Sequence, residues 1–394
     1  MTARIPLSVP VVGAHERERL LEAIDSGWIA PAGPQLDAFE DLVARRAGRR
    51  RAVGVSSGTA ALHLALIVAG VRPGDTVICP TLSFIASASS IVHAGAVPVF
   101  VDCDATGNIA PSLVEQALED GSRTGRRPAA VLAVDVYGKV ADHSALQRLA
   151  DVHGVPLVVD AAESLGAERD GAPAGSHGLV SALSFNGNKI ATASSGGVVL
   201  TDDDALADRA RHLATQAREP VPHYEHREIG FNYRLSNILA ALGLAQVERL
   251  DEFLAARRSH RAQYRALCER TAGLEILGGA DEGDNCWMTS LTVDPAVTGT
   301  DPLALREELA RAGIESRPVF APLHDQPVFS DADRYPRRLD GTAESLYRTG
   351  LSVPSSPASA PDQIAQVCAR IEDILARGAT AVASTTTDPR GAAE

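Results

Sequence analysis

The chain of 394 residues has few positive charges and no long apolar run. Its 37 lysine and arginine residues are outnumbered by 50 aspartate and glutamate residues, which gives a net charge of -13. This acidic balance argues against a nucleic acid or an anionic membrane as a partner, because both would be repelled. No apolar run approaches the length of a membrane span, and the first residues lack the pattern of a signal peptide. Any anionic ligand must therefore be held by local hydrogen-bond donors.

The cysteines form no metal-binding or disulfide pattern. They are odd in number and scattered, without a C-x-x-C pair: Cys79, Cys103, Cys268, Cys286 and Cys368. We therefore expect reduced thiols, no metal site and a cytoplasmic protein. A nicotinamide dehydrogenase is disfavoured, because no G-x-G-x-x-G follows the first predicted strand at residues 52–55.

Short apolar runs alternate with helical segments over the first 200 or so residues. Near-continuous apolar strands separated by helices are typical of a mostly parallel sheet covered on both faces. We predict a large α/β domain over residues 1–250 and a smaller α+β domain over residues 251–377. Residues 378–394 are rich in alanine, threonine and glycine without periodicity, and we predict a disordered tail there.

Several polar residues stand where predicted strands end. Residues 56–59 join a strand to a helix, where backbone N–H groups and the helix dipole favour an anion, although the same residues also suit a simple helix cap. Asp160 follows four apolar residues and needs a cationic partner if it is buried. Lys189 lies between an apolar strand and a glycine-rich turn. A buried lysine readily acts as a Schiff-base nucleophile, whereas an exposed one would have no such role.

These features together match the needs of pyridoxal 5′-phosphate. That cofactor requires an anion cradle, an aromatic stack, a carboxylate for its ring nitrogen and a lysine. Phe84 is the candidate aromatic residue, although an aromatic at such a position more often packs into a core. Because functional residues of a parallel sheet gather at the carboxyl ends of its strands, we expect these groups to meet.

The motifs resemble those of the DegT/DnrJ/EryC1/StrS family of pyridoxal-phosphate sugar aminotransferases, over about residues 5–375. The matching segments are Ser57-Gly-Thr-Ala-Ala-Leu62, Pro80-Thr-Leu-Ser-Phe-Ile-Ala86, Asp160-Ala-Ala-Glu163, Ser184-Phe-Asn-Gly-Asn-Lys189 and Gly230-Phe-Asn-Tyr-Arg-Leu-Ser-Asn237. The resemblance implies fold type I of pyridoxal-phosphate enzymes, the aspartate-aminotransferase fold, with a mostly parallel seven-stranded sheet in the large domain. It also implies a homodimer whose active sites are shared between subunits.

The resemblance further implies a role for each matching residue. Lys189 would form the Schiff base and move a proton between the cofactor and the sugar carbon. Asp160 would keep the ring nitrogen protonated, Phe84 would stack on the ring, and Glu163 would lie near the phenolic oxygen. The phosphate would be bound by Gly58, Thr59 and Ser184 and by Asn232 of the partner subunit. A lysine at position 189 favours transamination, because the dehydratase branch of the family has histidine there.

The expected reaction moves an amino group from L-glutamate to a nucleotide-linked sugar. Asn186-Gly-Asn-Lys189, with Trp28-Ile-Ala-Pro31, resembles the branch that aminates C4 of dTDP- or UDP-linked 4-keto-6-deoxyhexoses, for an antibiotic sugar or a surface glycan. Candidate substrate contacts are Trp28, Asn188, Arg317 and His324. Asp135 departs from the histidine that much of the family has before its Tyr-Gly pair. Two alternatives stay open, a 3-keto-sugar or cyclitol-ketone aminotransferase and a catalytically silent pyridoxal-phosphate-binding regulator.

Overall fold

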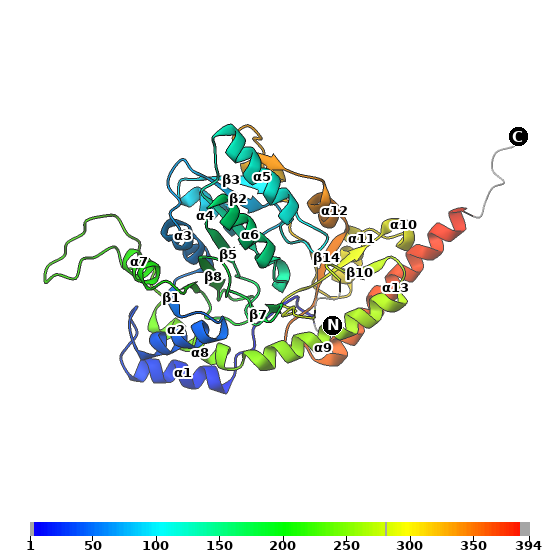
Figure 1. Cartoon of the computed structure of the whole chain (residues 1–394). Helices are drawn as coiled ribbons and strands as arrows, with labels where there is room; N and C mark the ends of the chain where they lie inside the picture. Colours follow the sequence, from blue (N-terminus) through cyan, green and yellow to red (C-terminus); the bar gives the residue numbers. More distant parts are fainter. Residues whose placement is uncertain (1–3, 280–281, 387–394) are drawn as a thin grey trace, which may run out of the picture.

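The computed structural model describes residues 4–279 and 282–386, and within them eight strands form one large sheet (Figure 1). These strands are β1 (Arg51–Val55), β2 (Thr76–Pro80), β3 (Val97–Val101), β4 (Ala130–Val134), β5 (Leu157–Asp160), β8 (Val180–Ser184), β9 (Gly197–Thr201) and β13 (Arg337–Arg338). Across the sheet their order is β1-β9-β8-β5-β4-β2-β3-β13. Neighbours are parallel except at β9, which runs antiparallel to β1 and β8. The predicted mostly parallel sheet is confirmed.

The sheet has one strand more than the predicted seven. The additional strand, β13, pairs in parallel with the edge of β3, so that Arg337 lies opposite Phe100. Two arginines show no apolar pattern from which a strand could be predicted. The strand forms because its backbone hydrogen-bonds to the edge of β3. The Phe100 N–H donates to the Pro336 carbonyl at 2.8 Å, and the Asp102 N–H donates to the Arg338 carbonyl at 2.8 Å. This short strand covers an edge that would otherwise be open for pairing.

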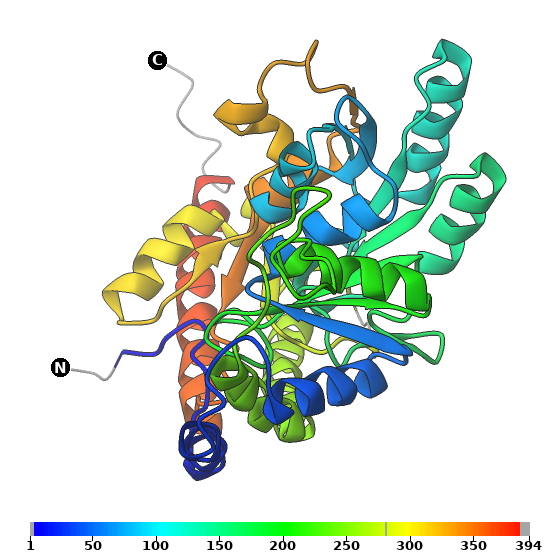
Figure 2. The same ribbon diagram turned by 90° about the vertical axis from the view of Figure 1, so that its left-hand side faces the viewer.

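Helices cover both faces of the sheet, as Figures 1 and 2 show. One face packs against α3 (Gly58–Val68), α4 (Ile85–His93) and α7 (Asp204–Ala214). The other face packs against α2 (Pro34–Arg46), α5 (Pro111–Thr124), α6 (His143–His153) and α8 (Asn237–Glu248). Alternate residues of β4 point to the two cores, with Leu132 in the first and Val131 in the second. Burial on both faces explains why the strands are apolar throughout.

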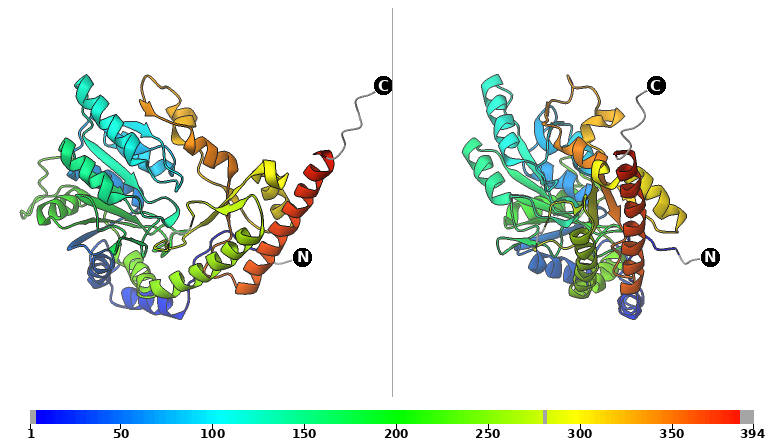
Figure 3. Two further views of the ribbon diagram at one scale, coloured as in Figure 1. Left: turned by 45° about the vertical axis from the view of Figure 1, so that its right-hand side comes forward. Right: turned by 90° about the vertical axis from the view of Figure 1, so that its right-hand side faces the viewer.

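A four-stranded antiparallel sheet forms the centre of the smaller part of the molecule. Its strands are β10 (Leu274–Ile276), β11 (Thr289–Val293), β14 (Gly350–Val353) and β12 (Arg317–Pro318). Its core includes residues of α9 (Leu250–Arg270), α11 (Pro302–Arg311) and α13 (Pro361–Thr386). In Figure 3, α9 and α13 run along the same side of this part. The remaining elements are α1 (Ala14–Asp25), β6 (Glu168–Arg169), β7 (Ala172–Pro173), α10 (Pro295–Thr298), α12 (Thr342–Thr349) and three short 3-10 helices, Val136–Gly138, Leu323–Asp325 and Pro327–Phe329.

The predicted disordered tail is wrong for residues 378–386. Helix α13 continues to Thr386, and residues 387–394 lie outside the described residues. Gly378 does not end the helix. A side chain there would collide with Thr300 and with the Thr298 carbonyl, so glycine permits α13 to pass close to these residues. The alanines that follow favour a helix.

Two segments connect the predicted domains across their boundary. Strand β13 lies after residue 250 in the chain but joins the large sheet. Conversely, the first residues bind the smaller part, where the Ile5 N–H donates to the Gly313 carbonyl at 2.9 Å and the Leu7 carbonyl accepts from the Ser355 N–H at 2.8 Å. The division at residue 250 stays a prediction, and it coincides with the change of helix at Arg249 between α8 and α9. Among the described residues, no helix combines the length and the apolarity that a membrane span needs.

Candidate active site

The carboxyl ends of β2, β4, β5 and β8 open into a cavity of about 390 Å³. The smaller part of the molecule closes its other side with residues 287–288, 317–318, 320 and 352. Nine of the predicted site residues line this cavity: Gly58, Thr59, Phe84, Asp160, Glu163, Ser184, Asn188, Lys189 and Arg317. They come from strand ends and loops far apart in the chain, and the sheet brings them together.

The start of α3 forms a cradle suited to a phosphate. The Ser57 hydroxyl caps the helix by accepting from the Ala60 N–H at 3.1 Å. A Cβ atom on Gly58 would lie 2.7 Å from the Ser184 Cβ, so glycine allows the helix to begin directly against Ser184. The Ser184 oxygen accepts from the Asn186 N–H at 3.4 Å, which leaves its own proton available to a ligand. First-turn N–H groups lack acceptors within the helix and, with the helix dipole, favour an anion.

Asp160 lies at the end of β5 with only 4% of its surface exposed. Burial raises the pKa of its carboxyl to about 6, against the lowering effect of hydrogen bonds from Ser87 and Ala162 and of the nearby Lys189 charge. The Ser87 hydroxyl donates to Oδ2 at 2.8 Å, and the Ala162 N–H donates to Oδ1 at 3.1 Å. A buried carboxylate of this kind gains stability from a cationic partner, and the protonated ring nitrogen of pyridoxal phosphate is such a partner.

Lys189 is held at the cavity wall by Glu163. Its Nζ lies 3.1 Å from Glu163 Oε1, while Glu163 Oε2 accepts from the Tyr137 N–H at 2.8 Å. The sequence contains one other lysine, Lys139, which is buried in an ion pair with Asp284 at 3.1 Å. Among the described residues that line the cavity, Lys189 is therefore the lysine positioned to form a Schiff base. Phe84, at the rim, leaves 54% of its surface exposed and thus has a ring free to stack on a ligand.

Trp287 lines the same cavity, although the sequence did not predict it as a site residue. Its ring centroid lies 4.3 Å from Lys189 Nζ, and its Nε1–H donates to the Asn188 carbonyl at 2.7 Å. This residue precedes β11 in the smaller part, so it brings the two parts of the molecule together at the lysine. The available signal was an aromatic residue at the start of the apolar segment 287–293, which we predict to be a strand, and such a residue more often packs in a core.

Tyr137 follows β4 at the same edge of the sheet, in a conformation that the sequence did not predict. It has a φ of 57°, which is uncommon for a residue other than glycine. This conformation aims its N–H at Glu163, and its hydroxyl oxygen accepts from the Phe320 N–H at 2.6 Å. By contrast, the nearby Asp135 is fully buried and accepts hydrogen bonds from Ala141 and Ser164 at 2.9 and 2.7 Å, outside the residues that line the cavity. The departure from histidine at this position therefore does not place a carboxylate in the cavity.

Three predicted site residues do not line the cavity of a single chain: Trp28, Asn232 and His324. The His324 side chain is 3% exposed, with Nδ1 at 2.6 Å from the Thr81 hydroxyl and Nε2 at 2.9 Å from Glu344. Both ring nitrogens are thus used in linking the end of β2 to α12, which opposes the prediction that His324 contacts the substrate. Trp28 is 53% exposed on the loop before α2. Asn232 is exposed on the connection between α7 and α8, which extends from the rest of the chain at the left of Figure 1.

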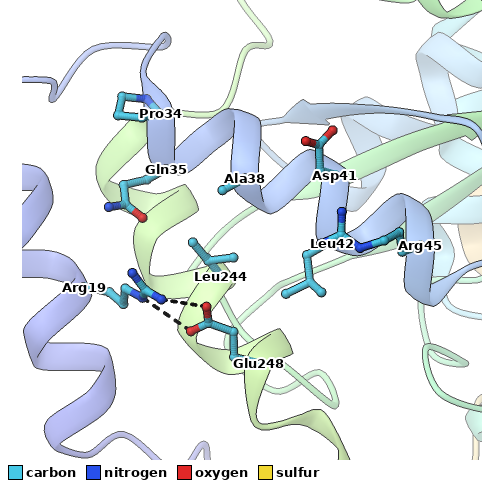
Figure 4. Close-up of a pocket in the computed structure, with 9 residues that line it drawn as sticks. All are labelled: Arg19, Pro34, Gln35, Ala38, Asp41, Leu42, Arg45, Leu244 and Glu248. Atoms are coloured by element: carbon cyan, nitrogen blue, oxygen red, sulfur yellow. Dashed lines mark hydrogen bonds and ion pairs between the residues drawn. The ribbon is translucent and has the colours of Figure 1, made fainter.

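A separate hollow of about 430 Å³ lies between α1, α2 and α8 (Figure 4). Arg19 points into it and is already paired with Glu248, with 2.8 Å between Nη2 and Oε1. None of the residues at the strand ends lines this hollow. The strand-end residues that match the needs of the cofactor line the first cavity.

Comparisons with known proteins agree with this geometry. Residues 10–372 match the DegT/DnrJ/EryC1/StrS aminotransferase family. EpsN of Bacillus subtilis (strain 168), whose name assigns it as a pyridoxal phosphate-dependent aminotransferase, is 42% identical over 93% of this chain and 95% of its own. The GDP-perosamine synthase of Caulobacter vibrioides is 35% identical over 94% of this chain and 98% of its own.

Solved structures give the same result. The crystal structure of DesI in the presence of its TDP-sugar product has a TM-score of 0.85 and 31% identity, and the match covers 96% of this chain and 94% of that one. TlmJ from Streptoalloteichus hindustanus, an aminotransferase, has a TM-score of 0.86 and 29% identity over 95% of this chain and 99% of its own. The predicted fold class and cofactor are confirmed. The chain belongs to the DegT/DnrJ/EryC1/StrS family and is a pyridoxal-phosphate-dependent sugar aminotransferase.

Proposed function

We propose that this enzyme transfers an amino group from L-glutamate to C4 of a dTDP- or UDP-linked 4-keto-6-deoxyhexose. The product is a nucleotide-linked 4-amino-4,6-dideoxy sugar. The observation that carries the proposal is the cavity that joins Lys189, Asp160 and the α3 cradle. The names of GDP-perosamine synthase and of DesI with its TDP-sugar product support a nucleotide-linked sugar. The C4 position rests on the sequence pattern around residues 28–31 and 186–189.

The side chains divide the work of this reaction. Pyridoxal phosphate, when bound, withdraws electrons from the carbon that carries the amine. Asp160 would hold the ring nitrogen protonated, which would maintain that withdrawal. Lys189 Nζ would take the proton from the donor carbon and return one to the sugar carbon, as a general base and acid. Glu163, fixed by the Tyr137 N–H at 2.8 Å, lies 3.1 Å from Nζ and would orient it for both proton transfers.

The substrate side of the cavity contains Arg317 and Asn188. Among the described residues that line the cavity, Lys189 and Arg317 carry the positive charges. The Arg317 guanidinium is 64% exposed and is oriented by Glu315 at 3.0 Å. A guanidinium binds phosphate oxygens in a fixed geometry, so we assign Arg317 to the diphosphate of the nucleotide-sugar.

Product analysis tests this function. Purified enzyme with L-glutamate is incubated with matched 4-keto and 3-keto nucleotide-sugars carrying dTDP, UDP or GDP, and the position of the new amine is read by NMR. We expect amination at C4 of a 6-deoxy sugar. A cyclitol ketone is included as a further acceptor. Amination at C3, or of the cyclitol ketone, would replace the proposal with the first alternative. A visible cofactor absorbance that glutamate leaves unchanged would instead indicate a silent binder.

We also propose that the enzyme is a homodimer in which Asn232 of each chain completes the site of its partner. In a single chain Asn232 lies outside the cavity, and its Oδ1 accepts from Gln216 Nε2 at 3.0 Å. The same connection exposes 80% of Tyr224 and 87% of Ile229. Large apolar side chains on a projecting segment are typical of a surface that a second subunit covers.

Mixing two inactive variants tests the shared site. Lys189→Ala chains and Asn232→Phe chains are combined under conditions that exchange subunits. In a mixed dimer both lesions fall at one site and leave the other intact, and half of the dimers are mixed. We therefore expect about one quarter of the wild-type activity for a symmetric dimer. Each variant mixed with itself serves as the control. No recovery after verified exchange would show that each site is built within one chain.

A further inference from the structure

Two serine hydroxyls, those of Ser83 and Ser87, form a hydrogen-bonded chain that ends at the carboxylate of Asp160. Ser87, in the first turn of α4, is 1% exposed, and its hydroxyl donates to Asp160 Oδ2 at 2.8 Å. The Ser83 and Ser87 oxygens are also 2.8 Å apart. Because a carboxylate can only accept, the Ser87 proton is committed to Asp160, and the Ser83 hydroxyl must donate to Ser87. Ser83 lines the cavity, so the chain runs from the cavity wall to the carboxylate.

We propose that Ser87 is a positioning residue that keeps Asp160 ionised and oriented toward the cofactor ring, with Ser83 orienting the Ser87 hydroxyl. The inference rests on the proposed pairing of Asp160 with the ring nitrogen. It adds a residue of α4, which touches neither the cofactor nor the substrate, to the machinery of the site. A hydrogen bond to a charged acceptor is stronger than one to a neutral group, so its loss should be measurable.

The surroundings of Asp160 favour its neutral form, and the hydrogen bond from Ser87 opposes this effect. Burial raises the pKa of Asp160, and Glu163 raises it further by repulsion. The Cys79 thiol on β2 stays neutral, since burial raises its pKa, and therefore adds no charge of either sign. The opposing groups are Ser87, the Ala162 N–H and the Lys189 charge. Of these, Lys189 changes its charge when it bonds to the cofactor, and the Ala162 N–H is backbone. Ser87 is therefore the constant side-chain donor that favours the ionised carboxylate.

Ser87→Ala tests the inference in the full chain, first without pyridoxal phosphate. The ionisation of Asp160 is followed by NMR of carboxyl-labelled aspartate, with its signal assigned by its loss in Asp160→Asn. In the wild type we expect a pKa near the value of about 6 that burial produces. Loss of a charged hydrogen bond should raise it by about 1–2 units in Ser87→Ala. Ser87→Thr keeps a hydroxyl and should restore most of the difference.

The affinity for pyridoxal phosphate gives the second readout. Because the carboxylate is less ionised in Ser87→Ala, affinity should fall about 2- to 10-fold at pH 7 and approach the wild-type value above about pH 9. Ser90→Ala is the matched control. Ser90 is equally buried on α4, but its hydroxyl donates to the Ala86 carbonyl at 2.7 Å, so the pH dependence should not change.

The outcomes separate this inference from the proposed function. An unchanged Asp160 pKa, with affinity lowered equally at every pH, would overturn the inference and leave Ser87 with a packing role. A raised Asp160 pKa with no change in the pH dependence of binding would support the effect of Ser87 on the carboxylate. That second result would overturn the pairing of Asp160 with the cofactor.

Discussion

Lys189→Ala should abolish turnover and leave the fold intact. No other described side chain in the cavity stands where it could form the Schiff base and move the proton, so we expect a loss of at least about 10⁴-fold. The fold should survive because Glu163 keeps its hydrogen bond from the Tyr137 N–H at 2.8 Å. Single-turnover measurements with glutamate give the rate, and circular dichroism with thermal unfolding reports on the fold.

The matched control is Lys139→Met. Lys139 is the other lysine of the chain, and Asp284, its partner, also pairs with Arg261 at 2.9 Å. Removing the Lys139 charge should lower stability, because a buried ion pair is broken, yet leave turnover near that of the wild type. Turnover that persists in Lys189→Ala, or that disappears equally in a folded Lys139→Met, would contradict the assigned role of Lys189.

Asp160→Asn should lower activity and raise the stability of the cofactor-free protein. Loss of a charged partner for the ring nitrogen should cost about 10- to 100-fold in rate as a minimum. The stability effect follows from the carboxyl pKa, which burial raises from 3.8 to about 6. Because the carboxyl pKa is higher in the folded chain than in the unfolded chain, the free energy of unfolding is greatest below pH 3.8. It falls as the pH rises from 3.8 to about 6. At pH 7 the buried charge of Asp160 lowers the free energy of unfolding by about 3 kcal/mol. An asparagine carries no charge and does not cause this loss.

Denaturant unfolding at two pH values measures this effect. Without pyridoxal phosphate, Asp160→Asn should exceed the wild type by about 1–3 kcal/mol at pH 7, and the difference should shrink toward pH 4, where the carboxyl is largely protonated. Saturating cofactor should reverse the order at pH 7, because it stabilises the form that it binds more tightly. Turnover like that of the wild type in Asp160→Asn would show that Asp160 is a structural carboxylate at the end of a strand.

Local patterns predicted the large sheet and its strand-end residues well. The apolar runs of β4 and β5 are recognisable because both faces of these strands are buried, and such burial leaves a signature in consecutive residues. The same regularity placed Asp160 and Lys189 at one edge of the sheet. Motif resemblance then added Glu163, Gly58 and the other cavity residues that no single pattern singles out.

Features that depend on tertiary contact escaped prediction. Strand β13 is two arginines that pair with a distant edge, and the end of α13 is helical where composition favoured disorder. Trp287 contacts Lys189, about 100 residues earlier in the chain, and Ser87 contacts Asp160, 73 residues later. No local spacing in the sequence predicts either contact. His324 shows the reverse situation: its motif position suggests a substrate contact, whereas in the structure its ring links the end of β2 to α12.

Borohydride reduction of the enzyme loaded with pyridoxal phosphate tests the central claim most directly. Reduction makes the bond between the cofactor and its lysine permanent, and peptide mapping then locates it. The chain offers two lysines for this bond, Lys139 and Lys189. We expect the adduct on the peptide that contains Lys189, in the wild type and in Lys139→Met alike. An adduct on Lys139, or on the N-terminal amine, with Lys189 unmodified, would contradict the assignment of the active site.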